Sequence, residues 1–131
     1  MRAVSEQDSE AEPPRLRVHH REVDGAVVVA VSGEVDLATV PELEEQLFAA
    51  LGTRTMPVVA DLTEVSFLDS IGLSMLVRCH QLGLRNGTAL RVVAATRAVV
   101  RPLEVTMLDG LLDLYPTVTA ALATTAPDRQ R

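Results

Sequence analysis

An Asp–Ser pair, Asp69 and Ser70, lies between an apolar run and the start of a long amphipathic segment. This placement predicts a hydroxyl group at a helix N-terminus, where free backbone N–H groups and the helix dipole stabilise negative charge. Such a hydroxyl is suited to reversible charging, which would make Ser70 a switch rather than a turnover site. The pair by itself also permits a plainer interpretation, in which Asp69 caps the helix and Ser70 is only its first residue.

The residues after this pair predict where the Ser70 side chain lies. Polar residues recur at helical spacing from Ser70 onward, and apolar residues recur beside them. We therefore expect Ser70 on the exposed face of a helix over about 70–85, which ends at Asn86-Gly87. The predicted polar stripe consists of Ser70, Ser74, Arg78, Gln81 and Arg85, and the apolar stripe of Ile71, Met75, Cys79 and Leu82.

Other chemistry is not expected from these residues. Ser70 and His80 are ten helical residues apart, about 15 Å, which is too far for a hydrolase pair. His19 and His20 are neighbours in a predicted strand and point to opposite faces, while Cys79 and His80 share no helix face. We therefore expect no catalytic residue, no metal site and no cofactor, and the chain has no Gly-rich phosphate loop.

Composition limits the class of protein and of partner. The chain has 131 residues, 47% of them hydrophobic and only 2% aromatic, which fits one domain with an aliphatic core. Its net charge is −6 and every basic residue is Arg, so nucleic acid is not an expected partner. No apolar run approaches the ~20 residues of a membrane span. The single cysteine and the polar, acidic N-terminus predict a cytoplasmic protein without a signal peptide.

Apolar runs alternate with amphipathic segments along most of the chain. This order predicts an α/β fold with a mixed, mostly parallel sheet of four to five strands and about four helices. The domain is expected over 15–124, with disordered tails at 1–14 and 125–131. Strands are expected at 16–23, 26–31, 57–62, 90–95 and 111–115, and helices at 40–52, 70–85, 96–106 and 117–123.

Turn and cap signals predict the connections. Asp24-Gly25 indicates a hairpin turn, and Thr39 with Glu42 has the spacing of a capping box. The segments 32–36 and 63–68 are predicted to be a loop or strand end and a loop, respectively. Thr96 and Thr117 are candidate caps for the last two helices, and Pro102 predicts a kink or a late start in the first of these.

Four segments in register make the chain resemble a STAS domain of the bacterial anti-sigma factor antagonist type, from about Leu16 to Ala123. They are Gly33-Glu34-Val35-Asp36-Leu37-Ala38-Thr39, Val59-Ala60-Asp61-Leu62, Phe67-Leu68-Asp69-Ser70-Ile71-Gly72-Leu73, and the segment from Leu111 to Pro116. The resemblance implies a protein that is not an enzyme. In this family an unphosphorylated antagonist binds an anti-sigma factor with serine kinase activity and thereby frees a sigma factor.

The same resemblance implies a phosphorylation switch. The kinase phosphorylates the serine that follows Asp in the motif, here Ser70, and the antagonist is released; a phosphatase of the PP2C type restores it. We expect the partner surface to be bordered by Asp36, Thr39, Asp69, Ser70, Ile71, Gly72, Ser74 and Arg78. For Asp36 and Thr39, a purely local role in shaping the turn and capping the helix is an equal alternative.

Two positions depart from the family pattern. Ile71 replaces a residue that is most often small or hydroxylic, which leaves Ser70 as the only hydroxyl between Asp69 and Leu73. Met107 stands before Leu108 where Gly is usual, a change expected to affect the end of the third helix.

Two other functions remain open at this point. A STAS scaffold subunit of a signalling or lipid-transport complex would leave Ser70 unmodified. A nucleotide- or small-ligand-binding sensor would hold its ligand in a crevice near Asp36 and Ser70.

Overall fold

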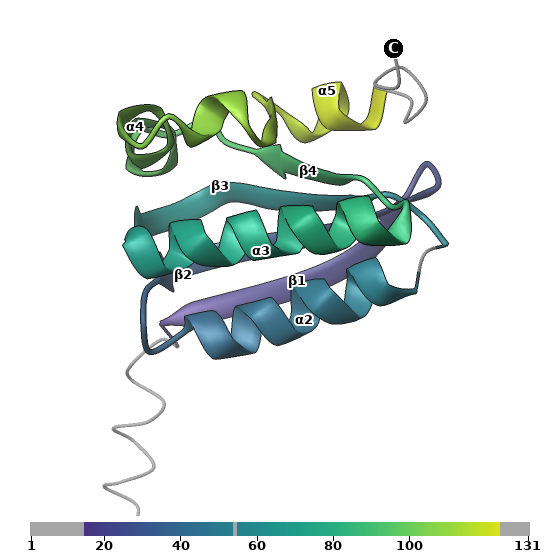
Figure 1. Ribbon diagram of the computed structural model, residues 1–131, viewed down its shortest axis with the longest axis horizontal. Coiled ribbons are helices and arrows are strands. Elements are labelled where there is room, and N and C mark those ends of the chain that lie inside the picture. The colour runs from purple at the N-terminus through teal and green to yellow at the C-terminus, as the bar shows by residue number, and fades with distance from the viewer. Residues whose placement is uncertain (1–14, 54, 124–131) are drawn as a thin grey trace, which may run out of the picture.

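The computed structural model describes residues 15–53 and 55–123, so the predicted tails at 1–14 and 125–131 lie outside the described residues. Strands and helices alternate as expected (Figure 1). In order they are β1 Leu16–Val23, β2 Ala26–Val35, α2 Val40–Gly52, β3 Val58–Leu68, α3 Ser70–Asn86, β4 Leu90–Val93, α4 Arg97–Val105, the 3-10 turn η1 Leu108–Gly110, β5 Asp113–Tyr115 and α5 Val118–Ala123.

The five strands form one sheet in the order β1-β2-β3-β4-β5. The β1–β2 pair is antiparallel and the other pairs are parallel, which confirms the mixed, mostly parallel sheet. The β1–β2 turn is the predicted one, since Asp24 and Gly25 both have positive φ, 50° and 79°. A two-residue turn of this kind matches the right-handed twist of the strands it joins.

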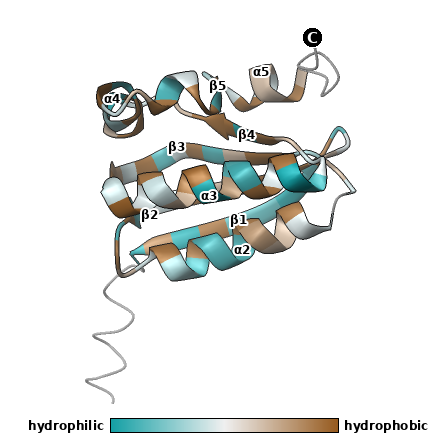
Figure 2. Ribbon diagram, viewed as in Figure 1, coloured by the Kyte–Doolittle hydropathy of each residue, from teal (hydrophilic) through white to brown (hydrophobic). Residues whose placement is uncertain are grey.

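The helices form layers on the sheet. Helices α2 and α3 lie side by side on one face, where Leu43, Leu47 and Leu76 are fully buried in the main core (Figure 1). Helix α5 covers part of the other face, where Ala121 packs in a smaller cluster with Val28, Val59 and Val93. The buried strand β4 and parts of β3 are accordingly hydrophobic (Figure 2). Among the described residues, no helix is long and apolar enough to cross a membrane.

Strand β3 is longer than predicted, because residues 63–68 are strand and not loop. Residues 32–35 of β2, predicted to be a loop or strand end, continue alongside them, with Gly33 opposite Val65 and Val35 opposite Leu68. Strand β4 pairs with β3 only as far as Asp61. Beyond that point α4 takes the place of a strand, since its Val99 and Leu103 pack into the main core. Pairing with a neighbour outweighs the weak strand preference of the polar residues here.

The predicted caps were right in part. Asp69 caps α3 and Thr117 caps α5, whose Ala120 N–H donates to the Thr117 hydroxyl at 3.0 Å. The capping box at Thr39 is wrong, because the Thr39 hydroxyl bonds inside the preceding loop and makes no cap bond to α2. Thr96 caps nothing, as its buried hydroxyl has no partner among the described residues. Pro102 lies inside α4, which begins at Arg97 and so does not start late.

Met107 has a left-handed backbone, with φ 63° and ψ 19°, directly after Thr106, the C-cap residue of α4. Its side chain is 79% exposed, so packing does not offset the steric cost of this conformation. We expect Met107→Gly to raise the free energy of unfolding by about 0.5–1 kcal/mol, since glycine reaches this region without strain. Urea denaturation measures the change. Met107→Ala retains Cβ and should show no gain, so an equal gain from both variants would contradict the backbone explanation.

Candidate functional site

The residues singled out by the sequence meet at one end of the sheet. Strands β2 and β3 run parallel and end opposite each other, with Val35 beside Leu68. The Asp69 N–H donates to the Val35 carbonyl at 3.3 Å. The loop that follows β2 and the first turn of α3 therefore leave the sheet together, as expected, at the left-hand end in Figure 1.

Asp69 and Gly72 hold the first turn of α3 in place. The Asp69 carboxylate accepts a hydrogen bond from the Gly72 N–H at 3.1 Å and so satisfies a backbone donor that the helix leaves free. Gly72 is buried against the strand ends: a Cβ atom there would lie 2.6 Å from a Leu68 methyl and 2.8 Å from a Val35 methyl. A glycine is needed for this close approach, which fixes the position of the neighbouring Ser70.

Ser70 is exposed, and its hydroxyl has no hydrogen-bond partner within residues 15–53 and 55–123. The predicted polar stripe is confirmed, because Ser74, Arg78, Gln81 and Arg85 are also exposed. The predicted apolar stripe is buried at Met75 and Cys79, but Ile71 is 40% exposed and lies outside the core. Ser70 and Ile71 together therefore present a hydroxyl and an apolar side chain to solvent on adjacent positions.

The loop between β2 and α2 is held by a network within the domain. Asp36 accepts hydrogen bonds from the Ala38 N–H at 3.0 Å and the Thr39 N–H at 3.3 Å. The Thr39 hydroxyl accepts from the Asp36 N–H at 3.0 Å and donates to the Glu34 carbonyl at 2.8 Å. Thr39 is only 9% exposed, so it shapes the loop that presents Asp36.

Arg15 joins the two carboxylates of this loop. Its guanidinium bonds Glu34 at 2.9 and 3.1 Å and also forms an ion pair with Asp36. Partial burial acts to raise the pKa of Asp36, but the Arg15 charge and the two backbone N–H bonds outweigh it and hold that pKa below its usual value. Asp36 is therefore ionised at neutral pH. The sequence reasoning missed Arg15 and Glu34, since only the β1–β2 pairing brings them to Asp36.

Arg78 is exposed but already paired. It bonds Glu44 of α2 at 2.7 and 2.9 Å, so it ties α2 to α3 on the outside of the helical layer. The hydrogen bonds from Arg78 lower the pKa of Glu44. A ligand or partner that recruits Arg78 has to compete with this ion pair.

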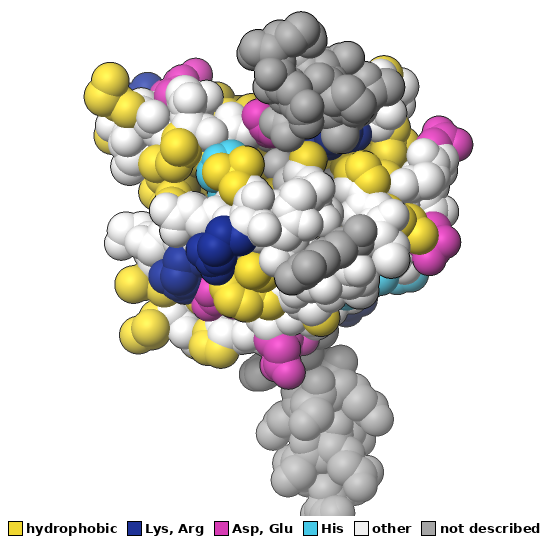
Figure 3. Space-filling view, turned by 45° about the vertical axis from the view of Figure 1, so that its right-hand side comes forward, with side chains coloured by type: hydrophobic (Ala, Val, Ile, Leu, Met, Phe, Trp, Pro, Cys, Tyr) yellow, Lys and Arg dark blue, Asp and Glu magenta, His cyan; other side chains and the backbone are white. Residues whose placement is uncertain are grey.

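Exposed apolar side chains are a further feature of this end of the sheet. Leu37 is 71% exposed, Phe67 49% and Ile71 40%, each within three residues of a loop or helix start described above. Figure 3, which brings the opposite end of the molecule forward, shows that small hydrophobic patches between polar side chains occur there as well. Exposed apolar groups beside an exposed hydroxyl favour a surface that binds another protein. Leu37 and Phe67 were not predicted, because their exposure depends on how the strands end.

A groove of about 410 Å³ begins at Ser70 and runs along α3 towards α4 and η1. Leu73, Val77 and Leu108 supply apolar lining, and Arg78 is its cation. The crevice predicted near Asp36 and Ser70 is not this groove, because Asp36 does not line the groove.

The remaining candidate ligands do not gather into a site. Among the described residues, no three His, Cys, Asp or Glu side chains lie close enough together to hold a metal ion. His19 and His20 are both exposed on β1, and His20 lies 2.6 Å from the Gln46 side-chain oxygen.

Cys79 is expected to be an unreactive thiol. It is fully buried, and burial raises its pKa to about 12. An aromatic disulfide reagent at pH 8 should therefore leave folded protein unmodified and should react quickly after unfolding in guanidinium chloride. Because the unfolded thiol ionises near pH 9 and the folded one near 12, stability should fall as pH rises through that window. Fast labelling of folded protein would contradict the buried position, and Cys79→Ala should remove this component of the pH dependence.

Comparison with known proteins agrees with this architecture. A family model described as the STAS domain matches residues 17–121. The chain is 30% identical over 110 residues, 84% of this chain and 89% of the relative, to the anti-sigma-F factor antagonist RsfB of Mycobacterium tuberculosis. It is 34% identical over 84 residues, 64% of this chain and 78% of the relative, to an anti-sigma-B factor antagonist of Staphylococcus aureus.

A solved structure gives the same result. The crystal structure of an anti-sigma factor antagonist from Mycobacterium paratuberculosis superposes with a TM-score of 0.79 at 37% identity, covering 86% of this chain and 95% of that one. The names of these relatives describe regulatory proteins that antagonise another protein, in agreement with the prediction that this chain is not an enzyme. The five-stranded mixed sheet, the covering helices and a match over 17–121 establish that the chain belongs to the STAS domain family.

Proposed function

We propose that this protein is an anti-sigma factor antagonist that acts in the cytoplasm and is switched by phosphorylation of Ser70. In the unphosphorylated form it binds a kinase-type anti-sigma factor and so releases the sigma factor that this kinase holds. The kinase then transfers phosphate from its own ATP to the Ser70 hydroxyl, and binding is lost. A PP2C-type phosphatase removes the phosphate and returns the antagonist to its binding form.

The observation that carries this proposal is the exposed hydroxyl of Ser70 at the start of α3, which has no hydrogen-bond partner in the described part of the chain. Asp69 and Gly72 fix the backbone on either side of it, so a kinase meets a hydroxyl in a defined position. Leu37, Phe67 and Ile71 supply apolar contact area around it. We assign the partner surface to these residues with Asp36, Asp69, Ser74 and Arg78, and assign Thr39 and Gly72 the role of holding it in shape.

The electrostatics of a charged Ser70 favour release. At about 5 Å and an effective dielectric of about 20, each unit of like charge costs roughly 3 kcal/mol before screening. The N-terminus of α3 stabilises the added negative charge by only about 0.3–1 kcal/mol. This stabilisation is present in the free protein as well as in the complex, so it does not offset the repulsion on binding. If the partner places acidic groups or packed surface against Ser70, repulsion and desolvation lower the affinity, and repulsion alone does so by about two decades for each unit of charge before screening.

The other two functions find less support. Among the described residues that line the groove beside Ser70, the one cation is Arg78, which is already bonded to Glu44, so a phosphate group would find no free cation there. A scaffold role gives no function to the exposed hydroxyl of Ser70. Copurification with an assembly other than a sigma-regulating kinase would favour the scaffold role.

The test is to incubate the full chain with the candidate kinase and ATP and to locate the phosphate by mass spectrometry. We expect one phosphate on Ser70 and none on Ser70→Ala. Ser74→Ala is the matched control, because Ser74 is an exposed serine one turn further along α3. Phosphate on Ser74, on a threonine or nowhere would contradict the proposal.

A further inference from the structure

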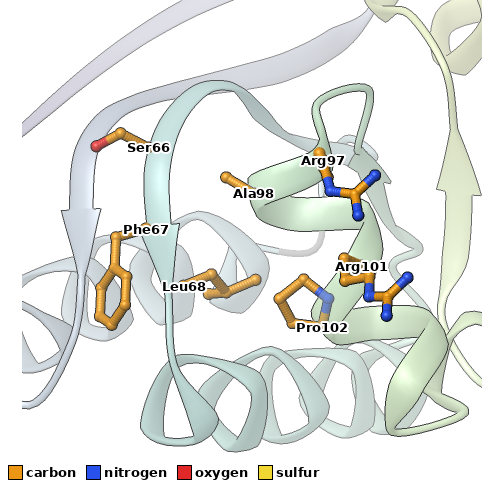
Figure 4. A pocket seen from close by; sticks show the side chains of 7 residues that line it. All are labelled: Ser66, Phe67, Leu68, Arg97, Ala98, Arg101 and Pro102. Carbon is orange, nitrogen blue, oxygen red and sulfur yellow. The ribbon is translucent and has the colours of Figure 1, made fainter.

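A second groove lies on the opposite side of β3 from β2, where β4 has ended and α4 takes its place. It measures about 340 Å³, and Leu68 and Pro102 face each other across it (Figure 4). Two arginines of α4, Arg97 and Arg101, line its α4 side, and in Figure 4 both guanidinium groups extend in the same direction, away from Leu68. The function proposed above uses Phe67 from this groove, but it leaves Arg97 and Arg101 without a role.

The α4 side of the groove is a site of uncompensated positive charge on an acidic protein. Arg97 and Arg101 are exposed, and neither forms an ion pair with any residue of 15–53 or 55–123. Glu104 follows Arg101 by three residues on α4 but is not paired with it. Because the whole chain carries a net charge of −6, two neighbouring free arginines favour an acidic segment as their partner.

The chain contains a matching acidic segment at residues 1–14. Its carboxylates, Glu6, Asp8, Glu10 and Glu12, recur at every second position, and Arg2 is its one basic residue. In an extended backbone this spacing places all four on one side, about 6.7 Å apart. Arg97 and Arg101 are four residues apart on a helix, where the Cβ atoms lie about 5–6 Å from each other. Two successive carboxylates of the segment therefore match the two guanidinium groups.

The point of attachment brings this segment within reach. Arg15 bonds Glu34, and Glu34 lies opposite Phe67 of β3, so the segment enters the fold two strand spacings, about 10 Å, from the groove. The nine residues from Glu6 to Arg15 can span about 30 Å when extended. Both the attachment point and α4 lie at the end of the sheet that carries Ser70 (Figure 1). Attachment to the same chain raises the effective concentration of the segment to the millimolar range.

We propose that the acidic segment 1–14 docks along the groove between β3 and α4, with its carboxylates paired to Arg97 and Arg101. The contact is electrostatic, weak and intramolecular. One consequence rests on the proposed function: a docked acidic segment beside Ser70 competes with the kinase for this end of the sheet.

Paramagnetic relaxation enhancement in the full chain tests the docking. A thiol-reactive nitroxide should label the Ser9→Cys variant only at residue 9, because Cys79 is buried. Wild type treated with the same reagent should remain unlabelled, which checks this selectivity. We expect strong enhancement at the amides of Ser66, Phe67 and Ala98. Raising the salt from about 20 to 500 mM should reduce it at least about threefold, since screening weakens exposed ion pairs.

Charge-reversal variants separate docking from random contact. R97E/R101E should lose the enhancement, and adding D8R/E10R to it should restore the signal. R21E/R85E is the matched control, because both arginines are exposed and lie away from the groove, and it should leave the enhancement unchanged.

Enhancement spread evenly over the surface, or unchanged by R97E/R101E, would overturn the proposal. In a mixture of isotope-labelled chains without nitroxide and unlabelled chains with nitroxide, enhancement would show that the contact is made by a second copy. That result would equally overturn the proposal. None of these readouts involves a kinase, so failure of the docking and failure of the proposed function are distinguishable.

Discussion

Replacing Ser70 by Asp is expected to weaken binding to the kinase-type anti-sigma factor by about 100-fold, while Ser70→Ala should stay within about twofold of wild type. The reason is charge at a contact: one unit of like charge at about 5 Å costs roughly 3 kcal/mol at an effective dielectric of about 20. Alanine removes only an exposed hydroxyl that has no partner in the described part of the domain. Calorimetry or surface plasmon resonance with purified kinase measures both affinities.

The fold should survive this substitution. An aspartate at the first residue of α3 is favoured by the helix dipole, so S70D should unfold at a urea concentration equal to or above that of wild type. Gln81→Asp is the matched control for charge, because Gln81 is exposed on the same stripe but eleven residues away, about 16 Å. It should leave kinase affinity nearly unchanged. Equal affinities for S70A and S70D would refute the switch.

Gly33→Ala is expected to lower the free energy of unfolding by about 3 kcal/mol or more. Gly33 has φ 108°, and an added Cβ would lie 2.0 Å from the Arg15 carbonyl oxygen. That oxygen accepts the Glu34 N–H at 2.8 Å, so neither backbone can move without breaking the β1–β2 pairing. Displacing Arg15 should also release Asp36 and loosen the loop beside Ser70.

Gly25→Ala provides a matched comparison in the same hairpin. Gly25 also has positive φ, 79°, but nothing lies within 4 Å of the position where its Cβ would be. Gly25→Ala should lower the free energy of unfolding only by the steric penalty of a left-handed backbone, about 1–2 kcal/mol. Urea denaturation of the two variants separates backbone strain from collision, and equal losses would show that Arg15 moves away at no cost.

The order of elements was predictable because it depends on local patterns. Apolar runs alternating with amphipathic segments yielded the strands and helices in their observed order, and Asp24-Gly25 and Asn86-Gly87 marked a turn and a helix end that the structure contains. Helical spacing alone placed Ser70 on an exposed face. The prediction of a loop at residues 63–68 is wrong, because their strand geometry comes from pairing with β2, which no local pattern encodes.

The sequence by itself singled out Ser70, the proposed switch residue, through an Asp–Ser pair at a helix start in register with three other segments. Only the tertiary structure decided what surrounds it. Pairing of β1 with β2 brought Arg15 to Glu34 and Asp36, and packing of α3 on the strand ends made Gly72 necessary. The early end of β4 let α4 present Arg97 and Arg101 beside β3. These contacts join residues that are far apart in the sequence. They depend on how whole strands and helices pair and pack, and the spacing of residues within one segment does not determine them.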